Sequence, residues 1–357
     1  MKTGIVGYGI YVPKLRLKVE EIWDMWQRGF PPSSIKELYG VEEKAVARWD
    51  EDVITMAVDA AKASLVLSDV APTKIGALFL GTSTNAYVTK ASAPIIAESL
   101  GLGHDVMCSD VQFAGKSGTT ALQIGIGLTE AGVVQHALAI GCDALSRHVA
   151  PNDIPLEYVA GSGGAAYVVG TEGVIAQTEN MYSYTTDTPD FFRLDGDRYI
   201  KRAVSSTEEW IVYSEHVREA IKRFNDRCGY ALKDFDYAVF SQPDGKIAMK
   251  TGAQIGFTSV QMAPGLISRE IGDCGSASPL IGLAAVLDIA NAGKRILVCS
   301  YGYGGGCDVL CLKTTDHLEI LRNSGFYKSV KEIIDDSTDI DFKHYLKMER
   351  KIIQEYL

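Results

Sequence analysis

The sequence predicts an α/β protein of two similar halves, with helices and sheets stacked in five layers as α/β/α/β/α. Three observations lead to this expectation. The order of strands, small-residue turns and helices in the first half recurs in the second half. One helix in each half is apolar nearly all round, and the segments that connect the repeated elements are charged and amphipathic.

The repeat contains four elements in each half. In the first half these are a strand at 75–80, a small-residue turn at 114–119, an apolar helix that follows it through Leu128, and a strand at 137–141. In the second half they are a strand at 237–240, a turn at 273–278, a helix at 279–289 and a strand at 295–300. Because both helices are apolar on every side, we expect them to be buried between two sheets.

Three regions are predicted along the chain. Residues 1–170 form the first half and residues 171–316 form the second half. Residues 317–357 form an appended helical tail that is rich in charged residues. The tail carries apolar side chains that need a cover, namely Phe342, Tyr345, Leu346, Ile352, Ile353, Tyr356 and Leu357. Either a partner protein or the chain's own dimer could bury these side chains, and the sequence does not decide between the two.

Composition excludes several classes of function. The 357 residues contain no apolar run long enough to span a membrane, and the N-terminal residues have no signal-peptide profile, so a cytoplasmic protein is expected. The seven cysteines include neither a CxxC pair nor clustered metal ligands, which predicts reduced thiols and no metal. The net charge of −10 is spread along the chain, so nucleic acid is not an expected partner.

The stretch at 182–193, YSYTTDTPDFFR, is similar almost letter for letter to archaeal hydroxymethylglutaryl-CoA (HMG-CoA) synthases. The resemblance extends from the glycine-rich start at 4–9 to about Asp316, and includes AAYVVG at 165–170 and GLAAVLD at 282–288. It implies a thiolase fold and a homodimer whose central sheets continue across the interface. It implies no cofactor.

Four positions that carry chemistry in that family are replaced here. The acylated cysteine at a helix start, where a helix N-terminus favours a thiolate, falls on Gly115. The histidine of a His-Gln-Pro motif falls on Ser241, the acid/base glutamate on Ser83, and the active-site asparagine on Asp273. The sequence therefore predicts that the catalytic residues of the family are absent.

The replacements themselves resemble the HMG-CoA-synthase-like subunit of bacterial phloroglucinol C-acetyltransferase, in QFAGKSGT at 112–119, GDCGSASPL at 272–280 and SYGYG at 300–304. In that complex a thiolase-like subunit carries the nucleophile, and an OB-fold protein with a zinc ribbon bridges the two. This resemblance implies a non-catalytic subunit that works with both partners, in a complex that transfers acetyl groups to a small acceptor such as a phenolic ring.

Other interpretations stay open. An autonomous acyl-CoA condensing enzyme, of the HMG-CoA synthase or ketoacyl synthase type, would need a relocated nucleophile, for which Ser117 and Cys274 stand at helix starts. Decarboxylation of a malonyl thioester needs mainly oxyanion donors, but Asp273 would repel an enolate. Lys116 has a counterpart in the family and is expected to position the loop, and the glycine run at 302–306 is expected to let backbone approach the site.

Overall fold

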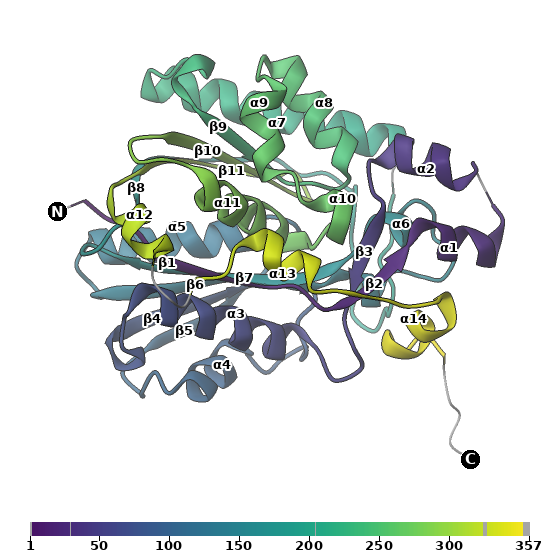
Figure 1. Ribbon diagram of the computed structural model, residues 1–357, viewed down its shortest axis with the longest axis horizontal. Coiled ribbons are helices and arrows are strands. Elements are labelled where there is room, and N and C mark those ends of the chain that lie inside the picture. Colours follow the sequence, from purple (N-terminus) through teal and green to yellow (C-terminus); the bar gives the residue numbers. More distant parts are fainter. Residues whose placement is uncertain (1, 29, 204, 324–326, 353–357) are drawn as a thin grey trace.

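The fold is a stack of five alternating layers of helix and sheet, which confirms the fold class predicted from the repeat. The computed structural model describes residues 2–28, 30–203, 205–323 and 327–352, without the side chains of residues 206–209. Figure 1 shows α3 (Val53–Ser68) and α4 (Ala93–Leu100) on one outer face, and α7 (Ser206–Cys228), α8 (Gly245–Ile255) and α9 (Ser259–Met262) on the other. Helices α5 (Ser117–Glu130) and α11 (Ser278–Ile289) lie between the two sheet layers.

Nine strands form one mixed sheet in the order β5-β4-β6-β7-β1-β8-β11-β10-β9. Their bounds are β1 Gly4–Tyr11, β4 Ile75–Gly81, β5 Met107–Val111, β6 His136–Ala144, β7 Ser162–Gly170, β8 Ala176–Thr185, β9 Tyr237–Phe240, β10 Arg295–Gly302 and β11 Gly306–Thr314. Strands β1 and β8 pair at only two positions, Gly4 with Gln177 and Ile5 with Ala176. This short pairing joins the two sheet layers. The strands of the first half lie on one side of it, and those of the second half lie on the other.

Of the two central helices, α11 is buried almost throughout, whereas α5 is buried on most sides but leaves Gly127 and Glu130 exposed. In α11 every residue from Ser278 to Ala284 is buried, as are Val286 and Leu287. The start of α5 packs closely against the second half, since a Cβ on Gly118 would lie 2.4 Å from the backbone oxygen of Ser276. Apolar side chains from both helices and both sheet layers thus form one continuous core.

A second, three-stranded sheet in the order β12-β2-β3 joins the tail to the N-terminal region. Its strands are β2 (Leu15–Lys18), β3 (Glu43–Val46) and β12 (Thr338–Asp339), and β12 runs parallel to β2. Helices α1 (Val19–Trp26), α2 (Pro32–Tyr39), α6 (Leu156–Val159) and α10 (Ser268–Ile271) complete the body of the protein.

The tail folds back on its own chain. It consists of α12 (His317–Arg322), α13 (Val330–Asp335), β12 and α14 (Phe342–Met348), which run along one side of the stack in Figure 1. Phe342 and Tyr345 are buried in a cluster with residues of α1, β3 and α6, so their cover is the protein's own core. The predicted apolar residues Ile353, Tyr356 and Leu357 lie outside the described residues.

Two further observations concern the chain as a whole. None of the helices in the described ranges is long and apolar enough to cross a membrane. All seven cysteines are free thiols, and five of them, Cys142, Cys274, Cys299, Cys307 and Cys311, are buried.

Candidate functional site

The start of α5 leaves no room for a side chain at position 115. Gly115 has a φ of +85°, in the left-handed region that favours glycine, and a Cβ there would lie 2.8 Å from the backbone oxygen of Tyr301. The backbone oxygen of Gly115 accepts a hydrogen bond from the Ser300 hydroxyl at 3.4 Å. The position at which the family carries its nucleophile is therefore occupied by close backbone contacts.

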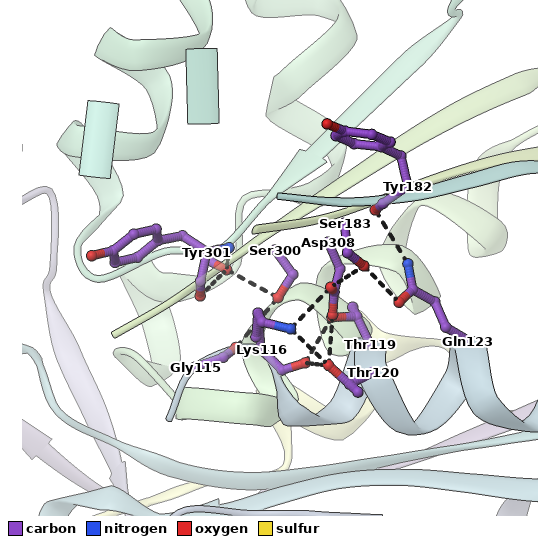
Figure 2. Close-up of polar contacts among 11 residues, drawn as sticks. Gly115, Lys116, Thr119, Thr120, Gln123, Tyr182, Ser183, Ser300, Tyr301 and Asp308 are labelled. Carbon is purple, nitrogen blue, oxygen red and sulfur yellow. Dashed lines mark hydrogen bonds and ion pairs between the residues drawn. The ribbon is translucent and has the colours of Figure 1, made fainter. Parts of the chain in front are cut away.

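Lys116 is buried in an ion pair and does not project into a cavity. Its Nζ lies 3.0 Å from Oδ1 of Asp308 and donates to the Thr120 hydroxyl at 3.0 Å (Figure 2). The same ammonium group lies 4.5 Å from the centre of the Phe113 ring. Asp308, on β11, also accepts from the hydroxyls of Thr119 and Thr120 at 3.0 and 2.7 Å. This network ties the first turn of α5 to the second half and holds the 113–116 loop in place.

The glycine run between β10 and β11 brings backbone against this loop. A Cβ on Gly302 would lie 2.6 Å from side-chain atoms of both Phe113 and Lys116. The Tyr303 amide also donates to the Ala114 backbone oxygen at 2.9 Å. The close approach expected for this run is thus made to the loop that carries Gly115.

The hydroxyl of Ser241 is engaged with the backbone. Its Oγ accepts from the Tyr301 amide at 2.8 Å, and it lies 3.2 Å from the Tyr301 oxygen, to which it donates. Ser300 Oγ is 3.3 Å away. A neutral hydroxyl in these contacts fixes the end of β10 and is not a general base near neutral pH.

Ser83 is one of several donors to a buried carboxylate. Oδ1 of Asp143, at the end of β6, accepts from the amide of Ser83 at 2.8 Å and from its hydroxyl at 3.1 Å. The hydroxyls of Thr82 and Thr84 donate to the same oxygen at 2.9 and 2.7 Å. Oδ2 accepts from the Ser276 amide at 2.8 Å, so Asp143 links the ends of β4 and β6 to the second half.

Asp273, Cys274 and Ser117 are enclosed by the protein. Burial raises the pKa of Asp273 to about 7, against hydrogen bonds from the Ser278 hydroxyl and the Gly275 amide at 2.7 and 2.9 Å. Burial also raises the pKa of the Cys274 thiol well above its usual value, which leaves it protonated. The hydroxyl of Ser117 is fully buried, 2.6 Å from that of Ser276. Neither Ser117 nor Cys274 lines the cavities at this site, so neither is placed to act as a replacement nucleophile.

An inner cavity of about 260 Å³ lies beside the 113–116 loop. Its walls include Ser83, Ala114, His148 and Tyr303, with aromatic rings of Phe113, Phe191 and Phe192. Of the four replaced positions only Ser83 lines it. Sequence reasoning missed His148, because the residue belongs to none of the motifs and reaches the cavity through the turn that follows β6.

A second cavity of about 330 Å³, called the outer cavity, shares one lining residue, Tyr303, with the inner one. It is formed by α8, the 155–159 segment and Tyr39, and two of its residues, Lys246 and Lys250, are cationic. The ammonium group of Lys250 lies 4.1 Å from the centre of the Trp210 ring. Among the residues with described positions, no three His, Cys, Asp or Glu side chains gather closely enough to hold a metal ion.

Known proteins are similar to this chain in both sequence and fold. The family model for 3-oxoacyl-[acyl-carrier-protein (ACP)] synthase III matches residues 109–187. The hydroxymethylglutaryl-CoA synthases of Methanothermobacter thermautotrophicus and Archaeoglobus fulgidus are each 41% identical to this chain, over 98% of it and 99% of their own length.

Solved structures of low sequence identity share the fold. One is described as MvaS in complex with 3-hydroxy-3-methylglutaryl coenzyme A; it is 21% identical, with a TM-score of 0.87 over 99% of this chain and 92% of its own. Another is 3-oxoacyl-[acyl-carrier-protein] synthase III from Aquifex aeolicus, 21% identical, with a TM-score of 0.80 over 87% of this chain and 99% of its own. The expected thiolase-like fold is thereby confirmed.

The expectation of a non-catalytic subunit is wrong. Relatives that align along nearly the whole chain are named as an enzyme, and the structure has two cavities that share Tyr303, one of which is lined by a histidine. The motifs reveal only the replaced side chains, and no pattern in the sequence places His148 beside them. The identity over nearly the full length of both proteins shows that this chain belongs to the hydroxymethylglutaryl-CoA synthase family.

Proposed function

We propose that this chain acts by itself as an enzyme that condenses acyl-CoA thioesters. The observation that carries the proposal is that Tyr303 lines both cavities, so that this one side chain separates a thioester bound near Lys246 and Lys250 from the inner cavity. The names of the relatives, hydroxymethylglutaryl-CoA synthase, support the same class of reaction. Acetyl-CoA and acetoacetyl-CoA are accordingly the first substrates to test.

The outer cavity suits the nucleotide end of CoA. Lys246 and Lys250 offer positive charge to phosphate groups, and Trp210 and Tyr39 offer aromatic faces to an adenine ring. The narrow pantetheine arm would then pass Tyr303, so that the acyl group enters the inner cavity between Ala114 and Ser83. This orientation places the thioester beside the loop at the start of α5.

Without a side chain at Gly115, the acyl group stays on CoA during the reaction. The carbon next to the thioester carbonyl loses a proton, and the resulting enolate forms a carbon–carbon bond with the carbonyl carbon of the second substrate. If that carbonyl belongs to a thioester, its C–S bond breaks, and CoA leaves as the thiol after its sulfur takes up the proton. If the carbonyl belongs to a ketone, its oxygen becomes an alkoxide, which takes up the proton.

The test is turnover by the purified chain with no other protein present. We expect mass spectrometry to detect a condensed acyl-CoA product from acetyl-CoA and acetoacetyl-CoA, with no acyl group attached to the protein. Lys246→Glu combined with Lys250→Glu should raise KM at least roughly tenfold, because two attractive charges become repulsive. Lys233→Glu, an exposed lysine away from both cavities, is the matched control. Absence of any product from a panel of short acyl-CoA pairs would refute the proposal.

The finer resemblance, to the phloroglucinol C-acetyltransferase subunit, stays a prediction, as do the thiolase-like and OB-fold partners that it implies. Co-purification of the tagged chain from its native cell tests for both partners. The turnover assay is independent of that outcome, because it uses the chain alone.

A further inference from the structure

We infer that His148 is the group that accepts the proton from the substrate in the inner cavity, an inference that rests on the proposed condensation of acyl thioesters. The family positions for a histidine and a glutamate are occupied by Ser241 and Ser83, neither of which is a base near neutral pH. Of the six histidines in the sequence, all of which lie in described ranges, His148 is the one that lines this cavity.

Its hydrogen bond fixes which nitrogen can act. His148 Nδ1 lies 2.9 Å from the backbone oxygen of Arg198. A carbonyl oxygen only accepts hydrogen bonds, so Nδ1 carries a proton and donates it there. In the neutral ring the lone pair is then on Nε2, the nitrogen not engaged with Arg198. A neutral imidazole held in one tautomer is the form that a general base requires.

The surroundings favour that neutral form. Burial is the largest cause that lowers the pKa of His148, and the positive charges of Arg193 and Arg147 lower it further. The Arg198 carbonyl and the carboxylate of Asp143 act in the opposite direction and do not outweigh burial. The ring is thus unprotonated at pH 7 and becomes cationic only in more acidic solution.

The turn that carries His148 is held by the tail. The hydroxyl of Ser146 donates to Oε1 of the buried Glu349 at 2.6 Å, and Arg147 Nε lies 3.2 Å from Oε2 of the same carboxylate. The guanidinium of Arg198 donates to the backbone oxygens of Glu349 and Arg350. The residue whose carbonyl orients the imidazole is therefore anchored at the same place as the turn itself.

The proton transfer balances without any further reactant. Nε2 takes a proton from the carbon adjacent to the thioester carbonyl, and the C–H electron pair becomes the enolate. After carbon–carbon bond formation the imidazolium returns the proton to the departing CoA thiolate or to the new alkoxide. The base is regenerated in each turnover, so neither a metal nor a redox partner is consumed.

Deuterium exchange into acetyl-CoA tests this step apart from condensation. In D₂O the wild-type chain should exchange the acetyl methyl protons, read by mass spectrometry, and His148→Gln should lower the rate at least roughly 100-fold. His104→Gln, which changes an exposed histidine, is the matched control. Retained CoA affinity, measured by calorimetry, and an unchanged circular dichroism spectrum would show that the variant is folded.

Three outcomes are distinguishable. Exchange by His148→Gln at a rate close to that of wild type would overturn the role of His148 even if condensation is observed. Exchange that depends on His148, without any condensed product, would support this inference and refute the proposed function. If the variant does not fold, the pH profile of wild-type exchange decides: the rate should fall below an inflection under pH 6.5, and a flat profile there would overturn the inference.

Discussion

At position 115 the structure opposes any residue other than glycine, for two separate reasons. The positive φ of Gly115 strains an L-residue by about 1 kcal/mol or more, and the oxygen of Tyr301 occupies the place of a Cβ. A restored cysteine would therefore displace the loop that Lys116 and Asp308 hold. Its thiol would also lack the acid and base of the family, since Ser241 and Ser83 are neutral hydroxyls.

We predict that Gly115→Cys lowers the thermal stability and forms no acetyl-enzyme with acetyl-CoA. Gly115→Ala should destabilise the protein about as much, because the Cβ and not the thiol is the cause. Gly101→Ala is the control for strain alone, since Gly101 has a φ of +67° and a Cβ added there would meet no atom within 4 Å. Melting temperatures and intact-protein mass measure both effects. A stable, acetylated Gly115→Cys protein would contradict this prediction.

The site residues show the limits of sequence reasoning at this scale. The motifs place Gly115, Ser83, Ser241 and Asp273 correctly near the strand ends and helix starts, because local patterns determine those positions. His148 is out of reach, because its role depends on a carbonyl that the fold brings to it from residue 198. A single imidazole outside any motif is indistinguishable in sequence from a structural one.

Among the secondary-structure elements, α14 is attached to the body by an unusual charged cluster. Two lysines contact the buried Tyr345, with their ammonium groups 4.6 Å (Lys44) and 4.4 Å (Lys351) from the ring centre and both hydrogen-bonded to its hydroxyl. Burial lowers the pKa of Lys44 to about 7 and that of Lys351 to about 8, and the nearby carboxylates of Glu157 and Glu349 offset only part of this effect.

These lowered pKa values determine how the stability of the docked tail depends on pH. A lysine with a lowered pKa binds fewer protons when folded than when unfolded, so it favours the docked tail most above its unfolded pKa of 10.5. That contribution is lost as the pH falls from there through the folded pKa values of about 8 and 7. The tail is therefore held most weakly in the same mildly acidic range in which His148 becomes protonated.

We predict that amide exchange in α14, corrected for the intrinsic rate, is faster in mildly acidic solution than in mildly alkaline solution. Lys351→Met should reduce this difference, because it removes one of the two charges that must be buried. Lys347→Met, an exposed lysine on the same helix, should leave the difference unchanged. Equal protection of α14 under both conditions in the wild-type protein would refute the assignment to the lysine pair.

Elements are predicted well where the pattern is local and repeated. The strands, turns and central helices of both halves are found close to their expected ranges, since a largely apolar helix is stabilised by burial in the core. The sheet β12-β2-β3 is not indicated by the sequence. Its strands are very short and come from opposite ends of the chain, so neither periodicity nor spacing reveals their pairing.

For the whole molecule, the two edges of the nine-stranded sheet differ. β9 is mostly buried, whereas β5 is partly or fully exposed along its length, with Met107 about half exposed. An exposed edge strand presents unpaired backbone groups that a second copy can pair with. We therefore expect β5 to form the interface of the homodimer that the family resemblance implies.

We predict a dimer in light scattering coupled to size-exclusion chromatography, and its dissociation by Met107→Lys. Met107 is the first residue of β5, and a charged side chain there would be buried at the interface without a partner of opposite charge. Met25→Lys is a close control, because Met25 is equally exposed but lies on α1, remote from β5. A wild-type monomer, or a dimer that Met25→Lys dissociates and Met107→Lys does not, would place this prediction in error.

Because Glu349 binds the turn at 145–148 and lies near the C-terminus, folding of the core and attachment of this turn to the tail occur at different times during synthesis. The nine-stranded sheet and the central helices are complete once β11 has emerged, whereas the contacts of Ser146, Arg147 and Arg198 with the tail form only when residues 349 and 350 have been made. The order of translation thus gives the nascent chain its core first and the tail's support of the 145–148 turn last, so an interrupted polypeptide would have the cavity without that support.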